Sequence, residues 1–425
     1  MLALQPGAGG VESALPTSTA QGPPSSPSPS PSLPLPLPLP LPLPLPLRNI
    51  QKPKQMSKSH AMHYWLDQPL RNGQEPHEWE PGNAEEAAAN IDKWYNAGRP
   101  LYPLETLQSI KDQLQQPLKQ GDLISVKGFD GEVYEWLVRI GEVKERYARD
   151  HDNVDEDGWP IENEEKKEEW VFCSASIHYT SYESLKDYLE WDTSRAYCPI
   201  GIAHIMVRKD QEAEAVSHVD VEAGLGSFRG ILDEWEGGDT WREIKSTLLS
   251  LGLRCKIPKV IGMACGRFTA STGYEECKRS AVQHAFLVLL KRALQESDLG
   301  PAEVACYAQD PAYSQTDQAV MKESGIDVVD DPEGFLQMDD NSLVFCCGPN
   351  ICVKQIMADT ARPSIIIWCA VKEDNPKYSS TDPNSSRVHK MVESYDRLEF
   401  PDDPDNNFTT MAIYVKKESR VVKPD

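Results

Sequence analysis

One turn in the second half of the chain has the residues needed to bind an anion. Ala264-Cys-Gly-Arg267 follows the apolar run Lys259-Val-Ile-Gly-Met263 and precedes a helical pattern. A glycine such as Gly266 lets backbone amides approach a phosphate or carboxylate at the start of a helix, and Arg267 could add a positive charge or lie in solvent. Because the full Gly-x-Gly-x-x-Gly pattern is missing, a tight strand-to-helix turn without a ligand is an equal alternative.

Three further candidate residues follow later apolar runs. Asp310 ends Val304-Ala-Cys-Tyr-Ala-Gln-Asp310, and Gly348 and Asn350 follow Leu343-Val-Phe-Cys-Cys347. In dinucleotide-binding sheets a carboxylate about 20 residues after the glycine turn binds a ribose hydroxyl. Asp310 lies more than forty residues after Gly266, so an Asp-Pro turn is an equal alternative. The candidate ligand-binding residues are therefore Gly266, Arg267, Asp310, Gly348 and Asn350, which would suit a nucleotide-type ligand whose identity the sequence leaves unknown.

The densest group of thiols is Cys346, Cys347 and Cys352. A metal site would need further ligands, and the nearest histidines in the sequence are His284 and His389. A nucleophilic cysteine needs a base within hydrogen-bond reach, and the sequence places none beside these thiols. We therefore predict buried thiols and no metal site, and no catalytic residue is assigned. His284, on a mostly apolar helical pattern, is predicted to be a hydrogen-bonded helix residue.

The apolar runs that would position these residues alternate with helical patterns. Strands are predicted over residues 259–263, 303–307, 326–329, 343–347, 364–371 and 411–415, and helices near 271–295, 314–324, 351–359 and 386–396. Short apolar runs separated by helices are typical of a parallel sheet covered on both faces. Residues 251–425 are therefore predicted to form an α/β, Rossmann-like, doubly wound domain with a mainly parallel sheet, whose ligands bind at the carboxyl ends of the strands.

Residues 58–250 contain nine of the ten tryptophans and are predicted to form an α+β region. Its expected elements are helices over 83–98 and 102–114, a strand pair over 121–143 with an Asp130-Gly131 turn, and a solvated loop over the charged segment 150–169. The tryptophans could stack on bases or sugars. At helical spacing on an acidic chain, we expect them instead to form core or to cover a neighbouring domain.

Residues 1–57 form a low-complexity tail. Ser-Pro repeats continue into a strict Leu-Pro alternation from Leu33 to Leu47. Proline at every second position prevents helix and sheet interiors, so the tail is predicted to be disordered or extended as polyproline II. It could contact aromatic-grooved adaptor domains through Leu33–Leu47, or be an inert tail. A further alternative is that translation begins at Met56.

The chain of 425 residues has a formal net charge of −23, with 66 acidic and 43 basic side chains. This excess of negative charge disfavours direct binding to nucleic acid or to anionic membranes. No apolar stretch reaches the roughly 20 residues of a transmembrane helix. The ten cysteines lie mostly in apolar runs, form no Cys-x-x-Cys pair and follow no secretory signal, which favours a reducing cytoplasmic or nuclear setting.

Four of these segments, in this order, resemble the sensitivity-to-red-light-reduced family, over roughly Trp235 to Asp374. Val260–Phe268 is similar to the family's first strand and its Gly-x-Gly-Ser/Asn-Phe turn, with Gly266 and Phe268 matching. Ser280–Leu287 resembles the helix that follows this turn in the family. Tyr307–Pro311 resembles the family's Tyr-Asp-Pro strand end, with two extra residues inside it. Leu343–Asn350 stands in the place of the family's Met-Pro-His-Cys turn.

The chain departs from the family's pattern in two of these turns. Ala264 stands where the family has its first glycine, and Arg267 where it has Ser or Asn. The histidine of the fourth motif is absent, and Gly348, Pro349 or Asn350 takes its place. If that histidine were catalytic in relatives, this chain would lack the group.

The resemblance implies a Rossmann-like domain and a regulatory protein with no established reaction. Family members are associated with light and circadian signalling, cell proliferation and haem-synthesis control, and the long Trp-rich extension resembles fungal members. The resemblance also implies protein partners and favours a role other than catalysis. The alternative is a nucleotide- or S-adenosylmethionine-dependent enzyme that uses the strand ends at Gly266, Asp310 and Asn350.

Overall fold

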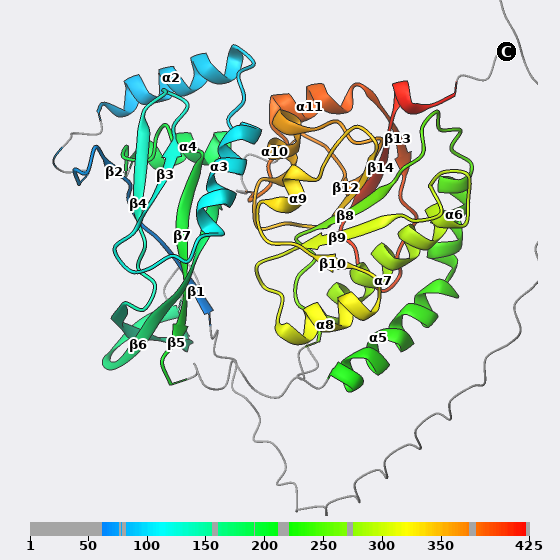
Figure 1. Cartoon of the computed structure of the whole chain (residues 1–425), viewed down its shortest axis with the longest axis horizontal. Coiled ribbons are helices and arrows are strands. Elements are labelled where there is room, and N and C mark those ends of the chain that lie inside the picture. Colours follow the sequence, from blue (N-terminus) through cyan, green and yellow to red (C-terminus); the bar gives the residue numbers. More distant parts are fainter. Residues whose placement is uncertain are drawn as a thin grey trace, which may run out of the picture. The chain divides into compact units, whose positions relative to one another are not determined.

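Figure 1 shows the computed structural model, which describes residues 62–75, 78, 82–154, 160–190, 192–210, 221–269, 275–373 and 380–421. The predicted tail at 1–57, including Leu33–Leu47 and Met56, lies outside the described residues. Residues Ser59–Asp425 group into one unit by their contacts. Within this unit the described strands form three sheets, of four, seven and three strands.

The first part of the unit contains the two smaller sheets, both antiparallel. The four-stranded sheet has the order β1–β7–β6–β5, with β1 at Met62–Leu66, β5 at Val143–Val154, β6 at Pro160–Tyr179 and β7 at Ile200–Arg208. The three-stranded sheet has the order β2–β4–β3, with β2 at Leu70–Arg71, β3 at Leu123–Lys127 and β4 at Val133–Leu137. The helices here are α2 at Ala84–Asn96, α3 at Leu104–Leu114, α4 at Tyr182–Asp187 and the 3-10 turn η1 at Tyr188–Glu190.

Most of the local predictions in this part are confirmed, and one is wrong. Helices α2 and α3 and the β3–β4 pair lie where the sequence predicts them, and the Asn83 side chain caps α2 by accepting the Glu85 N–H. Within the predicted loop over 150–169, residues 150–154 are instead the end of β5 and residues 160–169 the start of β6, which pair as an antiparallel ribbon. The segment is dense in Asp, Glu and Lys, so it lacks the apolar alternation that identifies a strand, and Lys167 at its described end forms an exposed pair with Glu145.

The second part of the unit contains the seven-stranded sheet. Its order is β10–β9–β8–β11–β12–β14–β13. The strands are β8 at Lys259–Met263, β9 at Ala305–Gln309, β10 at Asp327–Val328, β11 at Ser342–Cys346, β12 at Ile365–Cys369, β13 at Tyr395–Glu399 and β14 at Met411–Lys416. β8 to β12 run parallel to their neighbours, and β14 is antiparallel to both β12 and β13.

The prediction of a mainly parallel sheet is therefore confirmed. Counted from β8, the strand order is 3-2-1-4-5-7-6, which agrees with the doubly wound order through the fifth strand. The sequence missed β13, because Tyr395-Asp-Arg-Leu-Glu399 is an edge strand with too many charges to resemble a buried one. The strand order reverses between β8 and β11, which remain parallel, and this is the switch point at which such sheets hold ligands.

Helices cover both faces of this sheet, as Figure 1 shows. Alternate residues of β11 divide between two apolar clusters, with Leu343 and Phe345 in one and Val344 and Cys346 in the other. The first cluster joins α5 at Val221–Glu236, α6 at Asp239–Leu249, α7 at Glu275–Gln295 and α8 at Gln315–Glu323. The second joins α9 at Glu333–Leu336, α10 at Val353–Thr360 and α11 at Ser386–Val392.

The second cluster continues into the first part of the unit. Ile91 of α2, Leu107 of α3 and Trp136 of β4 belong to the same buried cluster as Ile356 of α10 and Val388 of α11. Conversely, α5 and α6 precede the predicted boundary at residue 250 but pack with α7. Trp136, Trp170 and Trp241 are buried, so these three are core residues as predicted.

Candidate functional site

The first turn is anchored to the end of the neighbouring strand β9. Ala264 has a positive φ of 53°, and its N–H donates to the carbonyl of Gln309 at 2.9 Å. Gly266 also has a positive φ, 74°, and its N–H donates to Asp310 Oδ2 at 2.8 Å. The structure therefore brings together two of the five predicted site residues, Gly266 and Asp310.

Asp310 uses its other oxygen within its own loop. Oδ1 accepts the Ala312 N–H at 2.8 Å, which is the local geometry of the Asp-Pro turn that the sequence allowed. Burial raises the pKa of this carboxyl above its usual value, although the amides of Ala312 and Gly266 act in the opposite direction. Both oxygens hold the chain's own amides, so the side chain acts as a clip between the loops after β8 and β9.

A second carboxylate, that of Asp317, holds the residues that follow the turn at 264–267. Asp317, in the first turn of α8, accepts the Thr269 hydroxyl at 2.7 Å and the Phe268 N–H at 3.1 Å. It also forms a reciprocal capping box with Ser314. Burial alone would raise the pKa of Asp317, but the hydrogen bonds from Ser314 and Thr269 hold it below its usual range.

His284 lies beneath the first turn on α7, and its hydrogen bonds are satisfied as predicted. Its Nδ1 is 2.6 Å from the Ser280 carbonyl, so it donates there, and Nε2 accepts from the Tyr313 hydroxyl at 2.9 Å. Its ring stacks on Phe268 at 4.4 Å. Burial lowers the pKa of His284 to about 4, so the imidazole is neutral near pH 7 and supports the turn.

The other three predicted residues lie on the same edge of the sheet but take no part in the hydrogen bonds of this clip. Arg267 and Asn350 are exposed, and the described residues provide neither with a hydrogen-bond partner. Gly348, with φ 63°, follows β11 beside β8, because Met263 pairs with Cys346. The turns at Gly266 and Gly348 therefore flank the switch point, and their binding of a ligand stays a prediction.

Cys346, Cys347 and Cys352 are buried, as the sequence predicts. Burial raises the pKa of Cys347 to about 11 and that of Cys352 to about 12, and raises the pKa of Cys346 well above its usual value. These groups are therefore thiols and not thiolates near pH 7. Within the described ranges, no three His, Cys, Asp or Glu side chains gather in a way that could hold a metal ion.

A partly buried aspartate next to the site was missed from the sequence. Asp331, which follows β10, accepts the Tyr179 hydroxyl at 2.7 Å and the Gln309 amide at 2.9 Å. Tyr179 ends β6, so this contact joins the two parts of the unit. Burial raises the pKa of Asp331 to about 7, despite the two hydrogen bonds. The Asp-Asp-Pro sequence after a short apolar run was the available signal, but its partner is far away in the chain.

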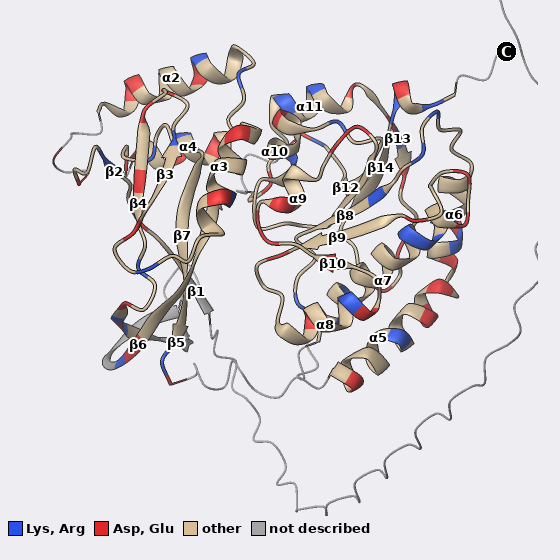
Figure 2. Cartoon of the chain, viewed as in Figure 1, with Lys and Arg blue, Asp and Glu red and all other residues tan. Residues whose placement is uncertain are grey.

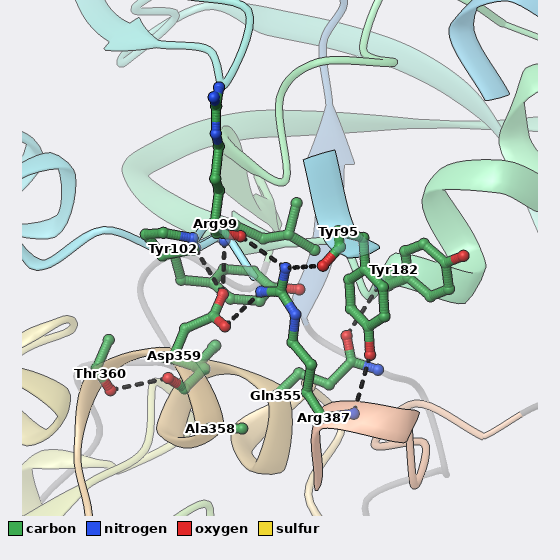
Figure 3. A network of polar contacts seen from close by, with 12 residues as sticks. Tyr95, Arg99, Tyr102, Tyr182, Gln355, Ala358, Asp359, Thr360 and Arg387 are labelled. Carbon is green, nitrogen blue, oxygen red and sulfur yellow. Dashed lines mark hydrogen bonds and ion pairs between the residues drawn. The ribbon is translucent and has the colours of Figure 1, made fainter. Parts of the chain in front are cut away.

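A second polar network, drawn in Figure 3, also joins the first and second parts of the unit. The Arg387 guanidinium, on α11, forms an ion pair with Asp359 of α10 at 2.6 Å. It also donates to the carbonyls of Tyr95 and Arg99 at 2.7 Å each and lies over the Tyr95 ring at 4.1 Å. We call Asp359, Arg387 and the backbone groups that they bind the interdomain clamp.

The acidic half of the clamp holds the chain just before α3. Asp359 Oδ2 accepts the N–H groups of Leu101 and Tyr102, so the carboxylate lies near the positive end of the α3 dipole. Gln355, one turn earlier on α10, adds a hydrogen bond from the Tyr182 N–H at 2.9 Å. The side chains of Asp359 and Arg387 are only 5% and 15% exposed, which makes this a buried ion pair and not a ligand site.

Helices α3 and α5 each carry charged side chains of both signs. Figure 2 shows acidic and basic residues following one another on α3 and on α5. This distribution gives these helices no purely basic face for a phosphate backbone. Within the described ranges, no helix combines the length and apolar character needed to cross a membrane.

The sequence of the second part matches a known family model. Residues 244–415, from within α6 to the end of β14, match the SRR1 domain. The matched range includes the clip at Gly266 and Asp310, the turn at Gly348 and the clamp residues Asp359 and Arg387. No curated protein matches the chain.

Two solved structures show a remote likeness. One is a protein from Corynebacterium glutamicum, 10% identical, covering 49% of this chain and 94% of that one with a TM-score of 0.26. The other is phosphoethanolamine N-methyltransferase 2 of Haemonchus contortus, in complex with phosphomonomethylethanolamine and S-adenosylhomocysteine. It is 11% identical and covers 56% of each chain with a TM-score of 0.22. At such TM-scores neither likeness assigns a ligand or a reaction.

Proposed function

We propose that this chain is a regulatory protein, on the premise that its residues 244–415 match the SRR1 domain. It acts by contacts with protein partners, and its Rossmann-like domain serves as a scaffold. The roles associated with the family, namely light and circadian signalling, cell proliferation and haem-synthesis control, are proposals for this chain. So are a cytoplasmic or nuclear location, a fungal-type origin and the lack of direct contact with nucleic acid or membrane.

The proposal rests on the hydrogen bonding and burial of the reactive groups at the carboxyl ends of the strands. Asp310 is hydrogen-bonded to two backbone amides, His284 is buried with both ring nitrogens bonded, and the buried Cys347 has a raised pKa. A general base must reach the proton that it abstracts, and a nucleophile needs such a base beside it. These groups instead hold the turns in place, which is the use expected in a scaffold.

The alternative is a nucleotide- or S-adenosylmethionine-dependent enzyme, and one observation favours it. Gly266 and Gly348 both adopt positive φ and lie in the turns that flank the switch point of the sheet. A glycine turn there allows close approach to an anionic ligand, and the exposed Arg267 could supply the opposite charge. The candidate ligand-binding residues remain Gly266, Arg267, Asp310, Gly348 and Asn350.

Thermal shift of the full chain tests the two functions against each other. The probes are NAD(P), S-adenosylmethionine, ATP, GTP and haem, and the scaffold proposal expects none of them to raise the melting temperature through the candidate site. A rise that is lost in Gly266→Val would contradict it and favour the enzyme. Gly141→Val is the matched control, because Gly141 also has positive φ, 87°, but lies in the turn before β5.

Gly266→Val is expected to be destabilised for two reasons, its positive φ and a Cβ position 2.9 Å from Ser280 Oγ. Arg267→Ala therefore gives a second test, since its side chain is exposed and its replacement leaves the turn intact. A ligand-induced shift that survives in Gly141→Val and falls in Arg267→Ala assigns the ligand to this turn. A shift that is unaffected by Arg267→Ala and Gly266→Val places the ligand elsewhere and leaves the scaffold role of this edge standing.

A further inference from the structure

The carboxyl ends of β11 and β12 place two cysteines side by side. The parallel register pairs Cys346 with Trp368, and one residue farther along each strand stand Cys347 and Cys369. Neighbouring strands lie about 4.8 Å apart, within the Cα separation of roughly 4.4–6.8 Å that a disulfide requires. Cys347 and Cys369 both pack in the apolar cluster beneath α7, so their side chains lie on the same face of the sheet.

A single hydroxyl contacts both sulfurs. Thr409 Oγ1, in the segment before β14, is 3.1 Å from Cys369 Sγ and 3.8 Å from Cys347 Sγ. Cys346, although adjacent in sequence, belongs to the opposite cluster and faces α9 to α11. The geometry therefore selects one partner for Cys369 among the thiols of the β11 end, and that partner is Cys347.

The two thiols have different surroundings, which suit different roles. Cys369 is partly exposed, and the Gly348 N–H donates to its sulfur at 3.3 Å. Partial exposure admits a small oxidant to the Cys369 sulfur. Cys347 is buried beside it, and burial raises the pKa of Cys347 to about 11, so this thiol is protonated near pH 7.

We propose that Cys347 and Cys369 form a reversible disulfide when the protein meets a peroxide. Hydrogen peroxide oxidises Cys369 to the sulfenic acid and releases one water. The Cys347 thiol then attacks the Cys369 sulfur, forms the S–S bond and releases a second water, so two thiols and one peroxide give one disulfide and two waters. A dithiol reductant reverses the reaction. The bond would join β11 to β12 beside Gly348, and this inference does not depend on the proposed regulatory role.

Peptide mapping of the full chain tests the proposal. The reduced protein is treated with a small molar excess of hydrogen peroxide, its remaining thiols are alkylated, and the tryptic digest is analysed without reduction. The expected product joins residues 323–354 to the peptide containing Cys369, is lighter than the two thiol peptides by two hydrogen atoms, and separates on reduction. Fragmentation between Cys346 and Cys347 assigns the bond within the first peptide.

Matched variants decide which thiol takes part. The linked product should be lost in Cys347→Ala and Cys369→Ala and retained in Cys346→Ala and Cys352→Ala, with melting of each reduced variant confirming that it is folded. A link that survives in Cys347→Ala overturns the proposal. So does a covalent dimer through Cys369, or oxidation of the exposed Cys255 and Cys173 at a dose that leaves Cys347 and Cys369 unlinked.

Discussion

Asp310 and Asp359 each hold two backbone amides with one carboxylate, but they connect different parts of the molecule. Asp310 joins two successive loops at the carboxyl edge of one sheet, where it accepts from Gly266 and Ala312. Asp359 joins the SRR1 domain to the chain before α3 and carries an ion pair with Arg387 as well. The first carboxylate shapes a turn, and the second holds two layers of the structure together.

The two regions differ in what their buried charged groups stabilise. At the edge where a ligand is expected, the carboxylates of Asp310 and Asp317 accept hydrogen bonds from the turns themselves. At the contact between the two parts of the unit, a buried ion pair, a cation over an aromatic ring and the Tyr179–Asp331 bond lie within one continuous apolar cluster. The described residues between 84 and 202 that share this cluster are therefore an integral layer of the fold.

The largest effect is expected from breaking the clamp with Arg387→Ala. Removing one partner of a buried ion pair leaves Asp359 with an uncompensated charge, at a cost of about 3–5 kcal/mol in the free energy of unfolding. Arg420→Ala is the control, because its pair with Asp396 is more exposed, at 38% and 36%, and should contribute less than about 1 kcal/mol. Urea unfolding measures both. Equal losses in the two variants would mean that the clamp is no stronger than a surface pair.

Asp331→Asn tests the other link between the two parts through its pH dependence. The pKa of Asp331 is raised from 3.8 to about 7 on folding, so the folded protein binds this proton more tightly than the unfolded chain. Stability contributed by the group is therefore present below about pH 4 and is lost as the pH rises toward 7. Asparagine keeps the oxygen that accepts from Tyr179 and Gln309 and carries no charge.

We expect Asp331→Asn to match the natural chain near pH 4 and to exceed it by up to about 4 kcal/mol above pH 7. Urea unfolding across this pH range measures the difference. Parallel stability profiles for the two chains would show that Asp331 does not titrate between these limits. In that case, protonation of Asp331 would not change the stability of the contact between the two parts.

A smaller effect is expected where one helix cap acts locally. Asn83→Ala removes the side-chain acceptor of the Glu85 N–H at the start of α2 and should cost about 1 kcal/mol. Asn83→Asp keeps an acceptor and should cost little. Thermal melting of the three chains gives the ranking. A loss in Asn83→Asp as large as that in Asn83→Ala would point to packing and not to capping.

The smallest effect is expected at the turn after β8, where one substitution should increase the free energy of unfolding. Ala264 has φ of 53°, a region that costs an L-residue about 1–2 kcal/mol, whereas glycine adopts it with an entropic cost of about 0.5–1 kcal/mol. Ala264→Gly should therefore stabilise the chain by about 0.5–1 kcal/mol. Ala308→Gly, in buried strand β9, should have the opposite sign. A loss in Ala264→Gly would mean that the alanine methyl group contributes packing that outweighs its backbone strain.

Several features of the candidate site could be predicted because they depend on neighbouring residues. Apolar runs gave the strands near Val260 and Leu343, and the glycines at 266 and 348 marked the turns that follow them. The roles of Asp331 and Asp359 could not be predicted in this way. Their partners Tyr179 and Leu101 are 152 and 258 residues away in the chain, and no local pattern records such a pairing.

The sequence by itself determined six of the seven strands between Lys259 and Val415, the family resemblance and the candidate residues, because hydrophobic period and turn chemistry act over a few residues. Only the tertiary structure decided what the groups there do. It placed Asp310, 44 residues beyond Gly266, against that glycine's amide, and packed the preceding layer onto α10 and α11. The physical reason is that a polar group's role depends on which distant partner the fold brings within hydrogen-bond range, and burial then fixes its charge.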